Sequence, residues 1–364
     1  MSRLYRTRLG KLLSRLKKTS LDAVMAGPGP NLRYLTGLAI EALERPVALV
    51  ATSTGSLFLL VPLLEYERAV SLEELGIEVR GYRDDEDPYK VLGSWLSGNS
   101  VRRLGLEGST PYRVASRLLD MGLDLVVADD LFSELRIRKD EWELKLVREA
   151  SRIAEEALRE AYRNLSPGVS ERELARIIRD RAEELGAESA PFIIVQSGPN
   201  TALPHAQASN RRVEAGDVIL FDIVVSYQGY YADITRTIVL GEPREEHRRI
   251  YEAVLEAQEK AIEAVAPGAR ASDVDKAARS LLEEKGYAEY FIHRTGHGLG
   301  LEVHEEPYIA PGNNRVLEPG MLFTIEPGVY LPGRFGVRLE DDIVVTSSGR
   351  EDLTRLCKDI SQIC

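Results

Sequence analysis

The chain has 364 residues, of which 44% are hydrophobic and 29% charged, so it is long enough to bury two sizeable cores. Its formal net charge of −11 and a pI near 5.2 argue against nucleic acid as a partner. No apolar run is long enough to cross a membrane. The two cysteines, Cys357 and Cys364, lie near the C-terminal end, and we expect both to be free thiols of a cytoplasmic protein.

Residues 1–20 are basic, contain no acid and are amphipathic, which is typical of a mitochondrial transit peptide. They are also typical of an ordinary first helix, because leucines recur at helical spacing and lead directly into a predicted strand, Leu21–Met25. These leucines are Leu9, Leu12, Leu13 and Leu16. We favour the second interpretation, in which the segment belongs to the first domain.

Residues 1–133 are predicted to form a first domain of the α/β class, in which apolar strand-like runs alternate with helical ones. The expected strands are Val47–Thr52, Leu57–Val61, Leu104–Glu107 and Leu125–Val127. The expected helices are Leu63–Leu75, Pro88–Leu96 and Pro111–Met121. The charged stretch Leu135–Glu143 is predicted to be the exposed start of a long helix that opens a second domain, residues 134–364.

The second domain contains an internal repeat. Residues 144–187 and residues 246–287 are each predicted to form two helices around a Pro-Gly turn. The predicted helix caps are Ser170 with Glu173 in the first copy and Ser272 with Asp275 in the second. Each copy then runs through a Phe-Ile pair to a histidine, His205 or His304, and to a hairpin that carries two acids. We therefore expect an α+β domain with a pseudo-twofold arrangement of its two halves.

Each of the two predicted hairpins carries a pair of facing acids. In the first, Asp222 follows the apolar strand Val218–Phe221. A turn centred between residues 227 and 228 places Asp222 directly opposite Asp233, with Cβ atoms about 5 Å apart. The second hairpin repeats the arrangement around residue 333, and its facing acids are Glu326 and Glu340. Because such pairs repel each other without a cation, these four acids and His297 form a candidate ligand set for two divalent metal ions.

Eight segments of the chain form specific motifs: Asn31–Gly37, Pro191–Asn200, Asp222–Thr237, His293–Gly300, Val303–Pro307, Glu318–Met321, Thr324–Tyr330 and Gly336–Glu340. Together these motifs resemble those of the M24 metallopeptidases, the family of prolidases, Xaa-Pro aminopeptidases and methionine aminopeptidases. The first domain resembles the creatinase/prolidase N-terminal domain. The resemblance covers essentially the whole chain and departs from the family at Val224, where glycine is usual. It implies a pita-bread fold for the second domain and a homodimer.

The resemblance also implies a role for each candidate ligand. Asp222 is expected to chelate the first ion, and Asp233 and Glu340 to bridge both ions. The ligands expected to complete the second site are His297 and Glu326. Oxygen-dominated ligation suits Mn²⁺ or Co²⁺, while Zn²⁺ and Fe²⁺ are alternatives. Two ions about 3.5–4 Å apart lower the pKa of a shared water, so that a hydroxide between the metals attacks the peptide bond.

Further residues resemble those that contact the substrate in the family. His205 and His304 are expected to flank the scissile carbonyl and the leaving proline, and to donate hydrogen bonds to the oxyanion. Arg338 lies two residues before Glu340, on the same face of a strand, and is expected either to fix Glu340 or to bind a substrate carboxylate. The expected walls of the substrate pocket are His293 and Tyr330.

The resemblance implies hydrolysis of Xaa-Pro peptide bonds. Because an X-Pro bond has no N–H, proteases that bind an extended backbone through this group handle it poorly. A metal-activated water attacks without that contact, and Glu326 is the expected proton shuttle to the leaving amine.

Compact length, without an extra N-terminal extension, favours a prolidase that cuts Xaa-Pro dipeptides. The alternative is an Xaa-Pro aminopeptidase, aminopeptidase P, which acts on longer peptides. A methionine aminopeptidase fits less well, because that group usually lacks this kind of first domain. A non-catalytic peptide-binding relative or a metal-free creatinase-like enzyme also fits less well, because those relatives lose metal ligands and this chain keeps all five.

Overall fold

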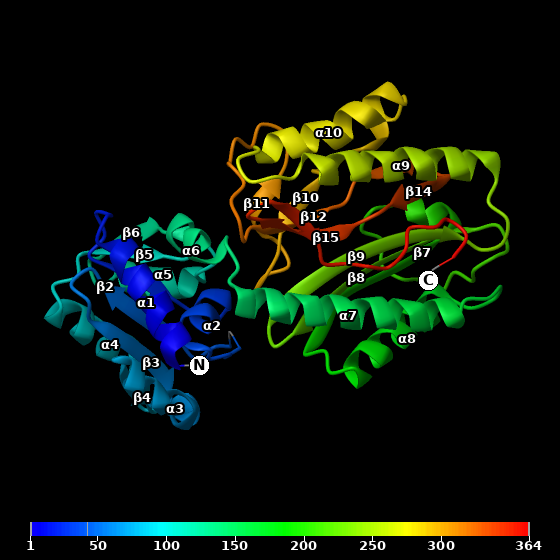
Figure 1. Cartoon of the computed structure of the whole chain (residues 1–364). Helices are drawn as coiled ribbons and strands as arrows, with labels where there is room; N and C mark the ends of the chain where they lie inside the picture. Colours follow the sequence, from blue (N-terminus) through cyan, green and yellow to red (C-terminus); the bar gives the residue numbers. More distant parts are fainter. Residues whose placement is uncertain (1, 42, 363–364) are drawn as a thin grey trace. The chain divides into compact units, whose positions relative to one another are not determined.

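The computed structural model describes residues 2–41 and 43–362. The chain divides into two compact units, Met1–Arg136 and Ile137–Cys364. Each unit has its own sheets and its own apolar core (Figure 1).

The first unit is built on a six-stranded mixed sheet with the strand order β4-β3-β2-β1-β5-β6. Its strands are β1 (Ala23–Ala26), β2 (Ala48–Thr52), β3 (Leu57–Pro62), β4 (Glu78–Tyr82), β5 (Arg103–Leu106) and β6 (Asp124–Val127). β2 runs antiparallel to both β1 and β3, and the outer pairs are parallel. The predicted α/β class is confirmed. The strand β4 was not predicted, because only two of its five side chains, Val79 and Tyr82, are apolar.

The helices of the first unit are α1 (Ser2–Leu16), α2 (Pro30–Thr36), α3 (Leu63–Ala69), η1 (Val70–Leu75), α4 (Pro88–Gly98), α5 (Tyr112–Leu119) and α6 (Asp129–Arg136). α4 and α5 pack against one face of the sheet, where the ring of Trp95 stacks on Phe58 at 4.8 Å. In α1, Leu9, Leu12 and Leu16 are buried, as expected for a helix that belongs to the domain.

The charged stretch at the end of the first unit is neither a single helix nor wholly exposed, so this prediction was wrong. α6 ends at Arg136, and α7 begins only at Glu141, after Asp140. Asp140 caps α7 in a capping box with Glu143. Lys139 is buried in an ion pair of 2.5 Å with Glu305. A buried ion pair of this kind cannot be distinguished from a solvated charge by composition alone.

The second unit has two similar halves, each with a pair of helices on a sheet. In the first half, α7 (Glu141–Arg163) and α8 (Glu171–Glu184) pack against a sheet of β7 (Ser189–Ser197), β8 (Val218–Tyr227) and β9 (Tyr230–Val239). In the second half, α9 (Glu245–Ala264) and α10 (Ala271–Glu284) pack against strands within residues 322–346. Figure 1 shows the strands of this unit between the two helix pairs.

The strands of the second half form two sheets. The first is five-stranded, in the order β11-β10-β12-β15-β16, and the other is the hairpin β13-β14. Their bounds are β10 (Gly296–Gly298), β11 (Glu305–Ile309), β12 (Leu322–Ile325), β13 (Gly328–Leu331), β14 (Phe335–Arg338), β15 (Asp341–Thr346) and β16 (Gly349–Asp352). Short 3₁₀ helices, η2 (Gly198–Ala202) and η3 (Ala288–Tyr290), follow β7 and α10. The predicted α+β class is confirmed.

The helix caps follow the predicted repeat in one copy only. Ser170 caps α8, and its capping box with Glu173 is present. In the second copy the N-cap of α10 is Arg270 and not Ser272, so the predicted cap was two residues too late. Asp275, the expected partner of Ser272, instead accepts hydrogen bonds from Thr295 and Arg279.

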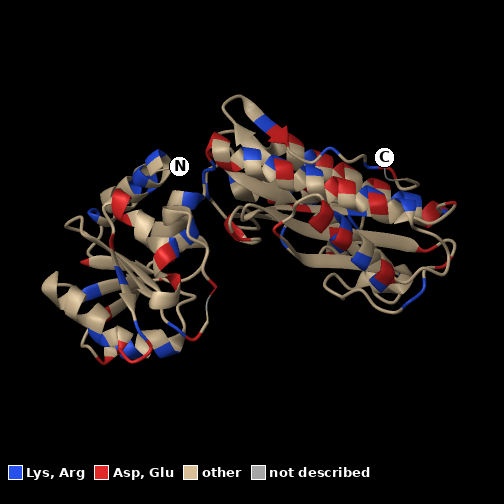
Figure 2. Ribbon diagram, turned by 90° about the horizontal axis from the view of Figure 1, so that it is seen from below, with Lys and Arg blue, Asp and Glu red and all other residues tan. Residues whose placement is uncertain are grey.

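Charged residues of both signs are interleaved on the long helices (Figure 2). On α7 they form ion pairs at a spacing of three residues, such as Arg152–Glu149 at 2.7 Å and Arg163–Glu160 at 3.0 Å. These residues form a solvated face. None of the described helices is both long enough and apolar enough to span a membrane.

The C-terminal segment corrects one prediction. Cys357 is bonded in a disulfide, so the expected free thiol at this position is wrong. Cys364, the other predicted free thiol, lies outside the described residues.

Candidate active site

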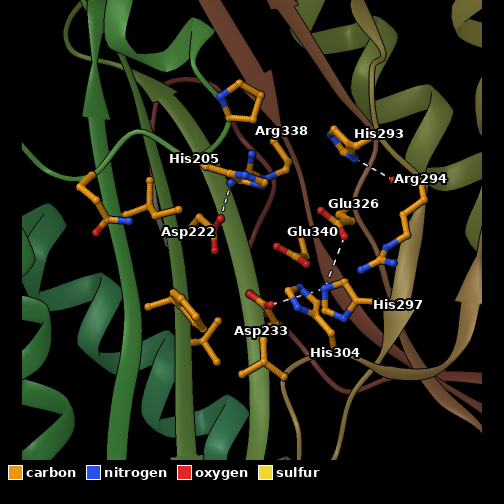
Figure 3. A pocket seen from close by; sticks show the side chains of 16 residues that line it. His205, Asp222, Asp233, His293, Arg294, His297, His304, Glu326, Arg338 and Glu340 are labelled. Atoms are coloured by element: carbon orange, nitrogen blue, oxygen red, sulfur yellow. Dashed lines mark hydrogen bonds and ion pairs between the residues drawn. The ribbon is translucent and has the colours of Figure 1, made fainter. Parts of the chain in front are cut away.

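A cavity of about 530 Å³ in the second unit is lined by nearly every site residue that was predicted from the sequence. The predicted residues that line it are Asp222, Asp233, His205, His293, His297, His304, Glu326, Arg338 and Glu340. Figure 3 shows Asp222 and Asp233 facing Glu326, Glu340 and His297. Tyr330 does not line the cavity, but it contacts two residues that do.

The two acids of the first hairpin share a face but are not directly opposed, so the predicted register was wrong. Asp222 pairs with Thr235, and Asp233 pairs with Val224. The turn lies at Gln228 and Gly229, one residue later than expected, with φ of 48° and 86°. Both acids still point into the cavity, because a shift of two residues leaves a side chain on the same face of a strand.

The second pair of acids has the predicted register. Ile325 pairs with Asp341, and Gly328 pairs with Arg338, so Glu326 and Glu340 occupy opposed positions between the two pairs. Glu340 is also held by the first half, because Thr235 Oγ1 donates to its Oε2 at 2.6 Å and its N–H donates to Thr235 O at 3.1 Å.

His297 reaches the acids from β10, which is squeezed between β11 and β12. A Cβ added at Gly296 would lie 1.8 Å from Thr324 O, and one at Gly298 would lie 2.4 Å from Glu306 O. Only glycine therefore permits this close approach on both sides of the histidine. His297 Nδ1 donates to Gly298 O at 3.1 Å, which leaves the lone pair of Nε2 directed at the acids.

The residues present fit divalent metal ions. Ligand atoms of Asp233, His297 and Glu340 lie within 4.8 Å of one another, and all three residues are buried. Asp233 Oδ1 and Glu340 Oε1 are buried and have no hydrogen-bond partner among residues 2–41 and 43–362. Buried carboxylate oxygens without donors are costly, and a cation is the group that satisfies them. Carboxylates with one imidazole form a donor set suited to such an ion.

The electrostatics of the site lead to the same conclusion. Burial, and then the neighbouring Glu340 and Asp222, raise the pKa of Asp233 well above its usual value. Burial and Glu326 do the same to the pKa of Glu340. Burial raises the pKa of Glu326 to about 7. Burial lowers the pKa of His297 to about 3, which keeps its ring neutral and able to act as a ligand. The cavity is therefore a cluster of acids that positive charge would stabilise.

Arg338 connects the two hairpins. Its guanidinium pairs with Asp222, donates to Tyr330 Oη at 2.8 Å and to Thr235 Oγ1 at 3.3 Å, and is buried. It reaches Glu340 only through Thr235, so Arg338 fixes Asp222 more directly than Glu340. These contacts use three of its five N–H donors, and the expected role in binding a substrate carboxylate stays a prediction.

The wall formed by His293 and Tyr330 is a directed chain of hydrogen bonds. His293 Nδ1 lies 2.7 Å from Arg294 O and must donate to it. Burial lowers the pKa of His293 to about 4, so the neutral ring accepts at Nε2 from Tyr330 Oη, at 2.9 Å. Tyr330 Oη in turn accepts from Arg338. The direction of every hydrogen bond in this chain is therefore fixed, and the side chains of His293 and Tyr330 are held in one orientation.

The two other histidines of the cavity, His205 and His304, face the acids from separate loops. His304 contacts His297 edge to face, with ring centroids 4.2 Å apart, and burial lowers its pKa. His205 lines the cavity from the loop after η2 and is exposed on its other side.

Arg294 is a cavity residue that the sequence analysis did not select. Its guanidinium stacks on the ring of Tyr308, 4.3 Å from the centroid, and within the described part of the chain it has no carboxylate partner. The signal was available, because Arg294 lies inside the motif His293–Gly300 that carries His297. Apolar residues also line the cavity: Phe192, Ile194, Val224 and Val303.

Comparison with known proteins identifies the class. Residues 145–347 match the metallopeptidase family M24, and residues 8–138 match the creatinase/prolidase N-terminal domain. The chain belongs to metallopeptidase family M24, and its second unit has the pita-bread fold of that family. The resemblance predicted from the motifs is thereby confirmed.

Individual relatives are similar over nearly their whole length. The chain is 40% identical to the Xaa-Pro dipeptidase of Pyrococcus horikoshii, over 95% of this chain and 96% of the relative. The crystal structure of dipeptidase PepE from Mycobacterium ulcerans has a TM-score of 0.93 at 36% identity, covering 99% of this chain and 98% of the other. The crystal structure of prolidase from Thermococcus sibiricus has a TM-score of 0.92 at 41% identity, covering 98% of each chain.

Proposed function

We propose that the protein is an Xaa-Pro dipeptidase that requires two divalent metal ions. The observation that carries this proposal is the cluster of buried acids around one neutral histidine, with two carboxylate oxygens that have no donor in the described part of the chain. Similarity to relatives named Xaa-Pro dipeptidase and prolidase supports the substrate.

The residues that would hold the two ions are Asp222, Asp233, His297, Glu326 and Glu340. Mn²⁺ or Co²⁺ suits this set best, with Zn²⁺ or Fe²⁺ as alternatives. Bound ions would supply a Lewis acid and a water of lowered pKa.

The side chains of the cavity divide the remaining work. Glu326 lines the cavity beside the other candidate ligands and would take a proton from water and return it to the proline nitrogen that leaves. His205 and His304, which line the cavity, would donate hydrogen bonds to the oxygen of the scissile carbonyl. Arg338 pairs with Asp222 and orients it, and with His293 and Tyr330 it forms a fixed wall beside the substrate.

Preference for a dipeptide is supported by Arg294. A dipeptide carries its C-terminal carboxylate within one residue of the scissile bond, so a nearby cation selects it over a longer peptide. Arg294 lines the cavity, and Tyr308 holds its guanidinium in place by stacking. Arg338 is the less suitable cation, because Asp222 already neutralises it.

The test compares Ala-Pro, Ala-Pro amide and Ala-Pro-Ala as substrates of protein loaded with Mn²⁺ or Co²⁺. We expect Ala-Pro to be cut with the highest kcat/KM, and we expect Glu326→Ala to abolish the activity. Arg294→Gln should reduce the discrimination between Ala-Pro and its amide at least tenfold. Faster cleavage of Ala-Pro-Ala would instead favour the aminopeptidase P alternative, and no cleavage of any substrate would favour a peptide-binding relative.

Assembly and location are part of the same proposal. We propose a homodimer, as the resemblance implies. We also propose a cytoplasmic location, although the disulfide at Cys357 removes the free-thiol argument for it. Sedimentation equilibrium of the metal-loaded protein at micromolar concentration should give twice the chain mass of 40.5 kDa. A single-chain mass would contradict the dimer.

A further inference from the structure

His205 enters the cavity from a segment, residues 203–210, that belongs to no helix or strand. The internal backbone bonding of this segment is limited, with Ala206 N–H donating to Leu203 O at 3.0 Å. A side chain on such a loop is poorly positioned unless contacts from outside hold the backbone. The position of the His205 ring therefore depends on residues elsewhere in the fold.

Glu171 holds the two ends of this segment together. It is the first residue of α8 and is fully buried. Its Oε1 accepts from Ser197 N–H at 2.7 Å and Asn200 Nδ2 at 2.9 Å, on the side before His205. Its Oε2 accepts from Ser209 N–H at 2.8 Å and Ser209 Oγ at 2.6 Å, on the side after it. One carboxylate, favourably placed at a helix N-terminus, thus closes the loop at both ends.

Gln196 holds the tip of the same segment. This residue lies on β7, and it is fully buried. Its Nε2 donates to Leu203 O at 2.6 Å and to Ala206 O at 2.9 Å, the carbonyls on either side of Pro204 and His205. Two carbonyl acceptors require an NH₂ group at this position, so the amide has a single orientation. A carboxylate at the same place would face two acceptors and would repel them.

We propose that Gln196 is a positioning residue for His205, and that it acts together with Glu171. The inference rests on the proposed function, in which His205 donates to the carbonyl oxygen during the reaction. We call Glu171 and Gln196 together the clamp of the segment 203–210. Because a displacement of about 1 Å at a hydrogen-bond donor such as His205 can cost about a hundredfold in rate, loss of the clamp should lower mainly kcat. Gln196 itself touches no substrate, since it does not line the cavity.

A double-mutant cycle tests the coupling to His205. We expect Gln196→Met to lower kcat for Ala-Pro ten- to a hundredfold and to change KM less than threefold. In a His205→Ala background the same change should cost less than threefold in kcat, because the group it positions is gone. Gln228→Glu, at an exposed turn, is the control for Gln196→Glu, and only Gln196→Glu should lose activity. If the kcat losses of Gln196→Met and His205→Ala instead multiply in the double variant, the proposal is overturned.

Hydrogen–deuterium exchange of the peptide covering residues 199–210 provides a readout independent of activity. Gln196→Met should exchange at least tenfold faster than wild type in this peptide, while β8 stays protected and the folded fraction is unchanged by circular dichroism. Unchanged exchange would overturn the clamp even if the enzyme cuts Xaa-Pro dipeptides normally. Faster exchange in a protein that cuts no Xaa-Pro substrate would support the clamp while contradicting the proposed function.

Discussion

Burial and neighbouring charges set the pKa of Glu326 more than its residue type does. The pKa of Glu326 is raised to about 7, first by burial and then by Asp222, although the cations of Arg338 and Arg294 oppose the shift. The fold therefore holds a proton on Glu326 more tightly than the unfolded chain does. Such a group destabilises the fold as pH rises from the unfolded pKa, near 4.5, to the folded one, near 7.

Glu326→Gln removes this titration, and its effect on the metal-free protein should depend on pH. At pH 8 the variant should be more stable than wild type by about 3 kcal/mol, because wild type must ionise an acid whose side chain is only 15% exposed. At pH 5 the difference should fall below about 1 kcal/mol. Urea unfolding at both pH values measures the difference between variant and wild type. The same difference at both pH values would show that the environment of Glu326 does not oppose its charge.

Arg338 is the residue whose loss should most disturb the site. Replacing it by glutamine leaves the part-buried Asp222 without its cation, which costs about 3 kcal/mol, the lower end for a buried pair, because its side chain is still 15% exposed. Arg338→Lys should recover part of this loss, because it restores the charge but not the contacts with Tyr330 and Thr235. Equal stability of both variants, measured by urea unfolding without metal, would contradict the assigned network.

At the scale of elements, the registers of the two hairpins decide where the four acidic ligands lie. These registers also show how far the sequence could predict the site. The opposed positions of Glu326 and Glu340 were predictable, because Gly333 marks the loop between their strands. In the first hairpin the turn was predicted one residue too early, which shifted the strand pairing by two residues. Gln228 and Gly229 both have positive φ, as a two-residue type I′ turn requires, and glutamine is unusual there. Placing the glycine second in the turn would have given the correct pairing.

The caps of the two repeated helices provide a matched pair of tests. Ser170→Ala should destabilise the protein by about 1 kcal/mol, because Ser170 accepts from Glu173 N–H and closes a capping box. Ser272→Ala should cost less than about 0.5 kcal/mol, because Ser272 follows the true N-cap, Arg270. Thermal unfolding compares the two. An equal loss in both variants would return the second cap to Ser272.

For the whole molecule, the fold class, the two-part organisation of the catalytic unit and the convergence of distant residues could be predicted from the motifs. What could not be predicted is pairing through space. The contact of Arg338 with Asp222 spans 116 residues, and the ion pair of Lys139 with Glu305 spans 166. Such contacts depend on how the two halves pack, which local periodicity does not specify. Arg294 was overlooked for a different reason, because it stands beside a stronger motif residue.

The central claim is that this cluster of acids binds two metal ions and thereby cuts Xaa-Pro dipeptides. The most direct measurement is a titration of metal-free protein with Mn²⁺, in which bound ions per chain and Ala-Pro hydrolysis are followed in the same samples. The account predicts two ions per chain in wild type, with activity rising as they bind, and at most one tightly bound ion with no activity in Asp233→Asn. Two tightly bound ions in Asp233→Asn, or full hydrolysis without any metal, would contradict it.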